Sequence, residues 1–157
     1  MNETQIQKIE DVLLSQGQYI GPTAGISMLP MLKNRRDTIV VTKKTGRLNP
    51  LDVALYKRGE QYILHRVLKV TDTGYIIRGD NCYADEIVPE EDVIGVLTEF
   101  FRKDKHVLCT DEKYLTYAKN RVKRYKLRRF FVLTWRKTVV AVKKPIKWIL
   151  RWDKRHK

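Results

Sequence analysis

A chain of 157 residues, 43% of them hydrophobic, is long enough to bury the core of one domain. It contains neither the apolar stretch of a secretory signal peptide nor the roughly 18 apolar residues of a membrane-spanning helix, so we expect a cytoplasmic protein. Residues 1–118 hold 16 Lys/Arg and 17 Asp/Glu, whereas residues 119–157 hold 16 Lys/Arg and one Asp, a net charge of +15. This basic segment favours an anionic partner, either phospholipid headgroups or a nucleic acid.

Residues 3–16 form the first expected element. Ile6, Ile9 and Leu13 fall at helical spacing and Gly17 supplies a stop, which predicts a short amphipathic helix. The segment is too short and too acidic for a DNA-reading domain, so we expect it to pack against the rest of the chain.

An apolar stretch rich in turn residues follows, at residues 19–32. Glycine and proline interrupt it so often that neither a long helix nor a regular strand fits. These residues are Gly21, Pro22, Gly25 and Pro30. The hydroxyl group of Ser27 lies at the centre of the stretch, among apolar neighbours. Taken alone, the pattern is typical of a loop whose serine caps a turn.

Short runs rich in β-branched and aromatic residues, separated by turns, occupy the middle of the chain. We expect strands at 38–42, 53–56, 62–70 and 75–78, and one more strand or a bent pair at 93–97 and 99–101. The third and fourth runs should pair as a hairpin. Because no helix lies between these runs, they predict a mainly β, antiparallel, barrel-like fold.

From residue 111 the pattern becomes helical, so we expect a β domain over 1–110 and a basic helical segment over 111–157. Apolar residues there recur three or four apart, with basic residues near the opposite face. We expect this helix to be kinked or broken at Pro145.

A basic face opposite Trp, Phe and Ile is typical of a helix that lies on an anionic membrane. The residues expected to contact such a surface are Arg128, Arg129, Trp135, Arg136, Lys143, Lys147, Trp148 and Arg151. A helix packed on the sheet, with its basic face in solvent, is the alternative. Nucleic acid is the least favoured partner, because base-reading proteins more often mix Asn and Gln into a basic stripe.

Serine hydrolysis gives Ser27 a second interpretation. A serine nucleophile needs a base, a group that holds the base in one tautomer, and donors for the oxyanion. Of the three histidines, His65 alone lies within an expected strand, while the others lie in a charged turn and in the basic tail. Asp80 and Asp85 follow the hairpin that contains His65. Most chains of this length hold these residue types, so the chemistry alone specifies the site weakly.

Four segments in order resemble the motif series of type I signal peptidases and of the related self-cleaving repressor peptidases, which share the fold. They are Gly25-Ile26-Ser27-Met28-Leu29-Pro30-Met31-Leu32, His65-Arg66-Val67, Arg78-Gly79-Asp80-Asn81 with Asp85, and Val93-Ile94-Gly95-Val96. Asp37 and Asp52 match two further steps of the series, without the glycine that usually precedes each. The resemblance covers roughly residues 20–97 and implies a peptidase of this fold.

The resemblance also implies a role for individual residues. Ser27 would be the nucleophile, and its N–H would serve the oxyanion hole. The neighbours Ile26, Met28 and Pro30 would help to bind the substrate. His65, in its His-Arg-Val setting, resembles the base of the endoplasmic-reticulum and archaeal branch, whereas the bacterial enzymes generally use lysine.

The acidic residues implied by the resemblance are Asp80 and Asp85. Asp80 would orient or support His65, and Asp85 matches the second aspartate of the family, with Glu86 as a neighbouring candidate. No metal and no cofactor is expected.

Two departures from the family pattern stand out. Gly25 occupies the position where the family commonly has a serine hydroxyl near the oxyanion, so this donor is absent unless Thr23 or a backbone N–H replaces it. Losing one such donor costs about 10²–10³ in rate. The N-terminal membrane anchor is also missing, so the basic C-terminus would instead hold the protein to the cytoplasmic face of the membrane.

We therefore expect a serine endopeptidase that cleaves a leader or signal-like peptide, and the resemblance implies small residues before the scissile bond. One alternative is a self-cleaving regulator whose basic tail binds nucleic acid, although Ala24-Gly25 lies too close to Ser27 to fold back into its site. The other is a catalytically inactive module that binds peptides with the same fold.

Overall fold

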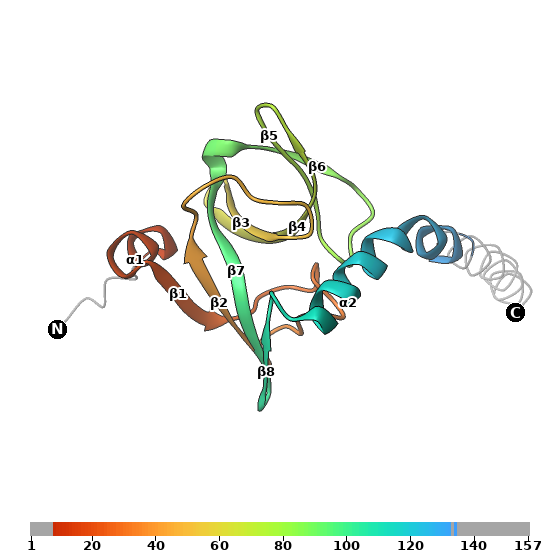
Figure 1. Ribbon diagram of the computed structural model, residues 1–157, viewed down its shortest axis with the longest axis horizontal. Helices are drawn as coiled ribbons and strands as arrows, with labels where there is room; N and C mark the ends of the chain where they lie inside the picture. The colour runs from red at the N-terminus through yellow and green to blue at the C-terminus, as the bar shows by residue number, and fades with distance from the viewer. Residues whose placement is uncertain (1–7, 133, 135–157) are drawn as a thin grey trace, which may run out of the picture. The chain divides into compact units, whose positions relative to one another are not determined.

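The computed structural model describes residues 8–132 and 134 (Figure 1). The chain divides into two compact units, Met1–Val122 and Lys123–Lys157. The predicted residues Trp135, Arg136 and Lys143, like the rest of 135–157, lie outside the described residues.

Within the described residues, eight strands form one antiparallel sheet that curls into a half-barrel (Figure 1). The strands are β1 (Gln18–Pro22), β2 (Asp37–Lys43), β3 (Val53–Arg58), β4 (Gln61–Thr71), β5 (Gly74–Arg78), β6 (Glu86–Pro89), β7 (Val93–Arg102) and β8 (Lys105–Leu108). Their order is β1-β2-β7-β3-β4-β5-β6, and β8 pairs with the second half of β7. The mainly β, antiparallel class predicted from the sequence is confirmed.

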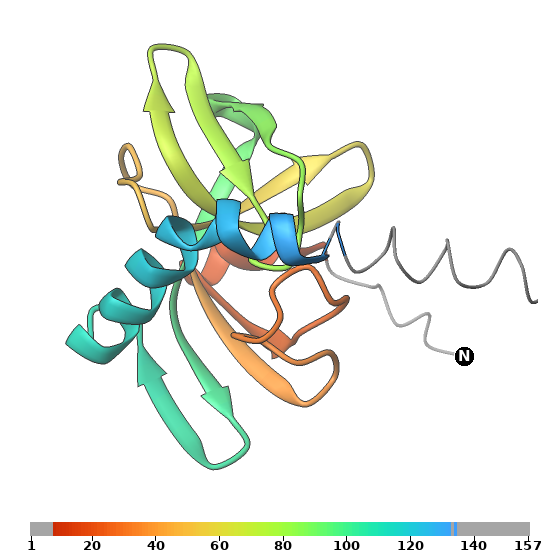
Figure 2. The ribbon, with the colours of Figure 1, turned by 90° about the vertical axis from the view of Figure 1, so that its right-hand side faces the viewer.

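Helices lie at both ends of the described chain. The N-terminal helix α1 (Ile9–Gln16) ends at Gly17, as predicted, and a short 3₁₀ turn, η1 (Glu90–Asp92), precedes β7. The helix α2 (Glu112–Lys123) begins soon after β8, and residues 125–132 form a second C-terminal helix. Figure 2 shows α2 crossing one side of the curled sheet. None of the helices in the described part of the chain is both long and apolar enough to cross a membrane.

Three strands were not predicted. β1 contains Gly21 and Pro22, which disfavour a regular strand, but β1 is an edge strand and has a partner on one side only. β8 contains His106, so the expectation that this residue lies in a charged turn is wrong; its ring stacks on Phe101. β6, the third, is four residues long. The last predicted run is one continuous strand, β7, rather than a bent pair.

Two clusters of buried side chains form the core of the sheet. One lies around Tyr56 and Tyr75, in β3 and β5. The other contains three residues of the loop between β1 and β2, namely Met28, Met31 and Leu32. Burial of one such side chain contributes about 1.5–3 kcal/mol, so this loop is anchored by its own apolar residues.

Candidate active site

The loop that carries Ser27 connects β1 to β2. Met28, immediately after the serine, is buried in the core, while Ser27 itself is half-buried. Gly25 has a φ of +85°, and its N–H donates to Oδ1 of Asn34 at 3.0 Å. Residues other than glycine rarely adopt a φ of this sign, so the backbone conformation favours glycine over serine at position 25.

Thr23 does not replace the missing oxyanion donor. Its hydroxyl group is buried and donates its single proton to the carbonyl of Lys33 at 2.8 Å. The N–H of Ser27 makes no hydrogen bond with any of the described residues. The backbone amide of Ser27 is therefore the donor available beside its own hydroxyl group.

A tight turn after β5 holds the serine loop in place. The N–H of Asn81 donates to the carbonyl of Ser27 at 2.7 Å, and its side-chain amide donates to the carbonyl of Ile26 at 3.2 Å. A Cβ atom at Gly79 would lie 2.8 Å from the Ser27 carbonyl oxygen and 2.9 Å from Nε2 of His65. The absence of a side chain at Gly79 thus allows the serine loop and the histidine ring to approach the same point.

His65 lies on β4, opposite Ala54 of β3, and is buried. Its Nδ1 atom lies 3.2 Å from Oε1 of Glu86 and 3.1 Å from the hydroxyl oxygen of Tyr56. That hydroxyl donates its proton to Oε2 of Glu86 at 2.8 Å, so its oxygen is left as an acceptor. Nδ1 therefore faces two acceptors and carries the ring proton, which leaves Nε2 with its lone pair on the side of Gly79.

The surroundings of His65 favour the neutral ring. Burial lowers the pKa of His65 below its usual value, the charge of Glu86 opposes this shift, and Arg58 adds to it. Burial and the hydrogen bond to Glu86 raise the pKa of Tyr56, so its hydroxyl stays protonated. At neutral pH the ring is thus an uncharged base, with a carboxylate placed to stabilise its protonated form.

Ser27 and His65 line one cavity of about 440 Å³. Cys82 and Glu86 also line it. No hydrogen bond joins the Ser27 hydroxyl to His65 within the part of the chain that the structure describes. Such bonds are often long before substrate binds and shorten in the complex.

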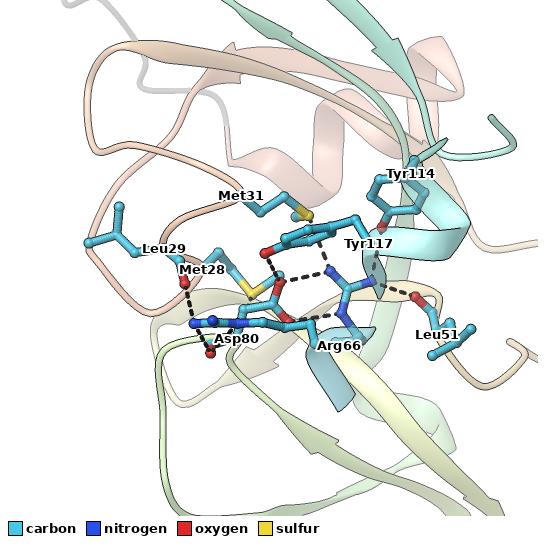
Figure 3. A network of polar contacts seen from close by, with 9 residues as sticks. Met28, Leu29, Met31, Leu51, Arg66, Asp80, Tyr114 and Tyr117 are labelled. Carbon is cyan, nitrogen blue, oxygen red and sulfur yellow. Dashed lines mark hydrogen bonds and ion pairs between the residues drawn. The ribbon is translucent and has the colours of Figure 1, made fainter. Parts of the chain in front are cut away.

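Asp80 makes no hydrogen bond to His65 among the described residues, so the prediction that it orients or supports the ring rests on its charge alone, which raises the pKa of His65 less than the charge of Glu86 does. The Asp80 carboxylate instead accepts two hydrogen bonds from Arg66, at 2.8 and 2.9 Å, and one from the hydroxyl of Tyr117 at 3.0 Å (Figure 3). Arg66 is fully buried and also donates to the hydroxyl of Tyr114. A buried guanidinium requires a paired carboxylate, which explains why the Asp80 carboxylate binds Arg66.

Helix α2 reinforces this network. Arg121 donates to the carbonyl oxygen of Asp80 at 2.8 Å and to that of Leu29 at 3.1 Å. It thereby connects the turn after β5 with the serine loop. No pattern in the sequence indicates this contact, because the basic residues expected to have a role all lie after α2, from Arg128 onward.

The remaining predicted residues divide into two groups. Asp85 is half-exposed and pairs with Arg78, so the acidic residue beside His65 is the neighbouring candidate Glu86. Met28 lines the cavity, whereas Ile26 and Pro30 are exposed and do not.

The described part of the second unit carries two of the predicted surface residues. Arg129 is exposed and Arg128 is half-buried. Three large apolar side chains of the same helix are exposed, namely Leu127, Phe130 and Phe131. The other predicted contacts, including Lys147, Trp148 and Arg151, fall outside the described residues.

Metal donors and known relatives give no further assignment. Within residues 8–132 and 134, no group of three or more His, Cys, Asp or Glu side chains is placed to hold a metal ion. Cys82 and Cys109 form no disulfide, and burial raises the pKa of Cys109 to about 11. The chain matches no protein-family model and no curated protein.

Proposed function

We propose that this protein is a serine endopeptidase of the signal-peptidase type, in which Ser27 is the nucleophile and His65 the base. The observation that carries the proposal is the buried His65 ring, whose Nδ1 lies against Glu86 and Tyr56 while its Nε2 lies beside Gly79, in the turn that binds the serine loop, and which lines the same cavity as Ser27. In this proposal Glu86, which lies 3.2 Å from Nδ1, takes the role of holding the histidine that the resemblance implies for Asp80. The curled antiparallel sheet is compatible with the signal-peptidase fold.

The reaction follows from this arrangement. His65 Nε2 takes the proton of the Ser27 hydroxyl as its oxygen attacks the peptide carbonyl, and Glu86 stabilises the imidazolium that forms. The Ser27 N–H donates to the developing oxyanion. His65 then returns the proton to the leaving amine, and water hydrolyses the acyl-enzyme with His65 again as base.

Asp80 has a structural role in this proposal. Its carboxylate neutralises the buried charge of Arg66, and its backbone carbonyl accepts a hydrogen bond from Arg121. The pair therefore maintains the turn that holds the Ser27 carbonyl, without taking part in proton transfer.

A catalytically inactive peptide-binding module is the second candidate. It is favoured by the absence, among the described residues, of a hydrogen bond from the Ser27 hydroxyl to His65, and by the glycine at position 25. Cleavage experiments separate the two candidates.

We also propose that the protein acts at the cytoplasmic surface of the membrane. The support is the second C-terminal helix, in which exposed Phe130 and Phe131 lie beside basic residues such as Arg129. Apolar side chains inserted between lipid headgroups, with cations on the anionic surface, are the usual arrangement of an interfacial helix.

A digest of a proteome-derived peptide library tests the proposed activity. The full-length protein should produce new peptide termini, which mass spectrometry detects, and both Ser27→Ala and His65→Gln should abolish them. The chain has one other serine, Ser15, exposed on α1, so Ser15→Ala is a matched control that should retain full activity. Cleavage that persists in Ser27→Ala would overturn the proposal.

A further inference from the structure

The cavity beside Ser27 is far larger than the space that a small substrate side chain needs. Its volume of about 440 Å³ lies within the range of about 300–1,000 Å³ that is typical of pockets for drug-sized ligands. It reaches from the serine loop to Leu32, Ile39 and Leu55, which belong to the buried core. A methyl group at this position would leave most of the cavity unfilled.

The walls of the cavity are mainly apolar. Met28, Tyr62, Ile63 and Leu64 line it together with the core residues. Two lining residues with charged side chains, Arg58 and Glu86, form an ion pair with each other at 2.8 Å. A charged substrate side chain would therefore find no unpaired partner, and its desolvation would be unfavourable.

We infer that this cavity binds a large apolar side chain of the peptide substrate, of the size of Leu, Met or Phe, next to the scissile bond. The inference rests on the proposed function, because the cavity gains this meaning from Ser27 and His65 in its wall. A large apolar side chain at this position differs from the small residues that the resemblance to signal peptidases implies before the scissile bond.

The peptide-library digest gives the first test. Cuts that depend on Ser27 should be enriched in Leu, Met, Phe or Tyr at one position beside the scissile bond, relative to Ala, Gly and Ser. For a synthetic peptide pair that differs only in Leu or Ala at this position, kcat/KM should differ by about tenfold or more, as is typical of apolar pockets. Preference for Ala, Gly, Ser or a charged residue would overturn the inference and leave the proposed function intact.

A cavity-filling variant tests where the side chain binds. Ala24 is exposed at the rim of the cavity, so Ala24→Phe fills part of it without disturbing the core. We expect kcat/KM to fall about tenfold or more for the Leu peptide and to change less than threefold for the Ala peptide. Thr73→Phe places the same ring at an exposed turn between β4 and β5 and should change neither. An equal loss for both peptides in Ala24→Phe would contradict the inference.

If the wild type cleaves no peptide, the binding of short peptides to the Ser27→Ala variant tests whether the cavity takes an apolar side chain. Acetyl-Ala-Ala-Leu-amide, titrated into the isotopically labelled variant, should shift the methyl signals of Ile63 and Leu64, and acetyl-Ala-Ala-Ala-amide should not. This result would support the apolar site, and the absence of cleavage by the wild type would by itself reject the peptidase, since a binding module needs the cavity but not the nucleophile. Absence of shifts with the Leu peptide would overturn the inference.

Discussion

Replacing Glu86 by Gln removes one charge from the side of His65 and keeps the shape of the side chain. Glu86 Oε1 lies 3.2 Å from Nδ1 of His65, and unit charges at such a distance attract each other by about 5 kcal/mol at an effective dielectric constant of about 20. Solvent reaches Glu86, whose side chain is 26% exposed, and screens about half of this attraction. We therefore expect the imidazolium to lose about 2.7 kcal/mol of stabilisation, which lowers kcat about 100-fold.

The pH dependence of the same variant gives an independent check. The negative charge of Glu86 raises the pKa of His65 against the effect of burial. Glu86→Gln should therefore lower the pKa of His65 further, and the acid limb of kcat/KM should move to lower pH. Initial rates with one peptide from the library digest, measured across this limb, are the assay.

Asp85→Asn is the matched control for Glu86→Gln. It removes the neighbouring charge, but Asp85 is half-exposed and pairs with Arg78 instead of His65. We expect less than a threefold change in kcat and no movement of the acid limb. If Asp85→Asn lost as much activity as Glu86→Gln, or if Glu86→Gln retained full activity, the assignment of Glu86 would be refuted.

Three further predictions concern stability and membrane binding. Asp80→Ala leaves the buried charge of Arg66 unpaired and should lower the free energy of unfolding by about 3–5 kcal/mol in urea titrations, whereas a loss of activity at unchanged stability would contradict its structural role. Since the pKa of His65 is lowered by folding, the wild type should lose stability relative to His65→Gln as pH falls below about 6.5, and a gain would contradict this sign. Replacing Phe130 and Phe131 by Ser should weaken sedimentation with phosphatidylglycerol vesicles severalfold; unchanged binding would exclude these rings as the contact.

Much of the sheet could be predicted because its strands are runs rich in β-branched and aromatic residues and several of its turns are short. The two-residue turn after Arg58 sets the register of β3 and β4, in which Ala54 is opposite His65. Tyr56 follows two residues after Ala54 and therefore lies on the same face of the sheet. The contact between Tyr56 and His65 was thus accessible from the sequence, once the hairpin register was assigned.

The acidic partner of His65 could not be predicted in the same way. Asp80 comes soon after β5, the strand that pairs with β4, and is therefore the acidic residue that the sequence places nearest to His65. In the structure its carboxylate binds Arg66, which follows His65 in β4 and lies on the opposite face of that strand. Glu86 reaches the histidine because β6 pairs with β5, with Glu86 opposite Ile77. This four-residue strand has no pattern of its own, so its register depends on tertiary packing.

The most direct test of the central claim is the reaction of the full-length protein with a fluorophosphonate probe. Ser27 should displace fluoride from the probe and form a single adduct, because His65 accepts its proton. Mass spectrometry should find this adduct on Ser27, not on Ser15, and it should be lost in His65→Gln. Labelling of both serines at equal rates, or labelling of Ser27 that is unchanged in His65→Gln, would contradict the claim that Ser27 and His65 act as a nucleophile and its base.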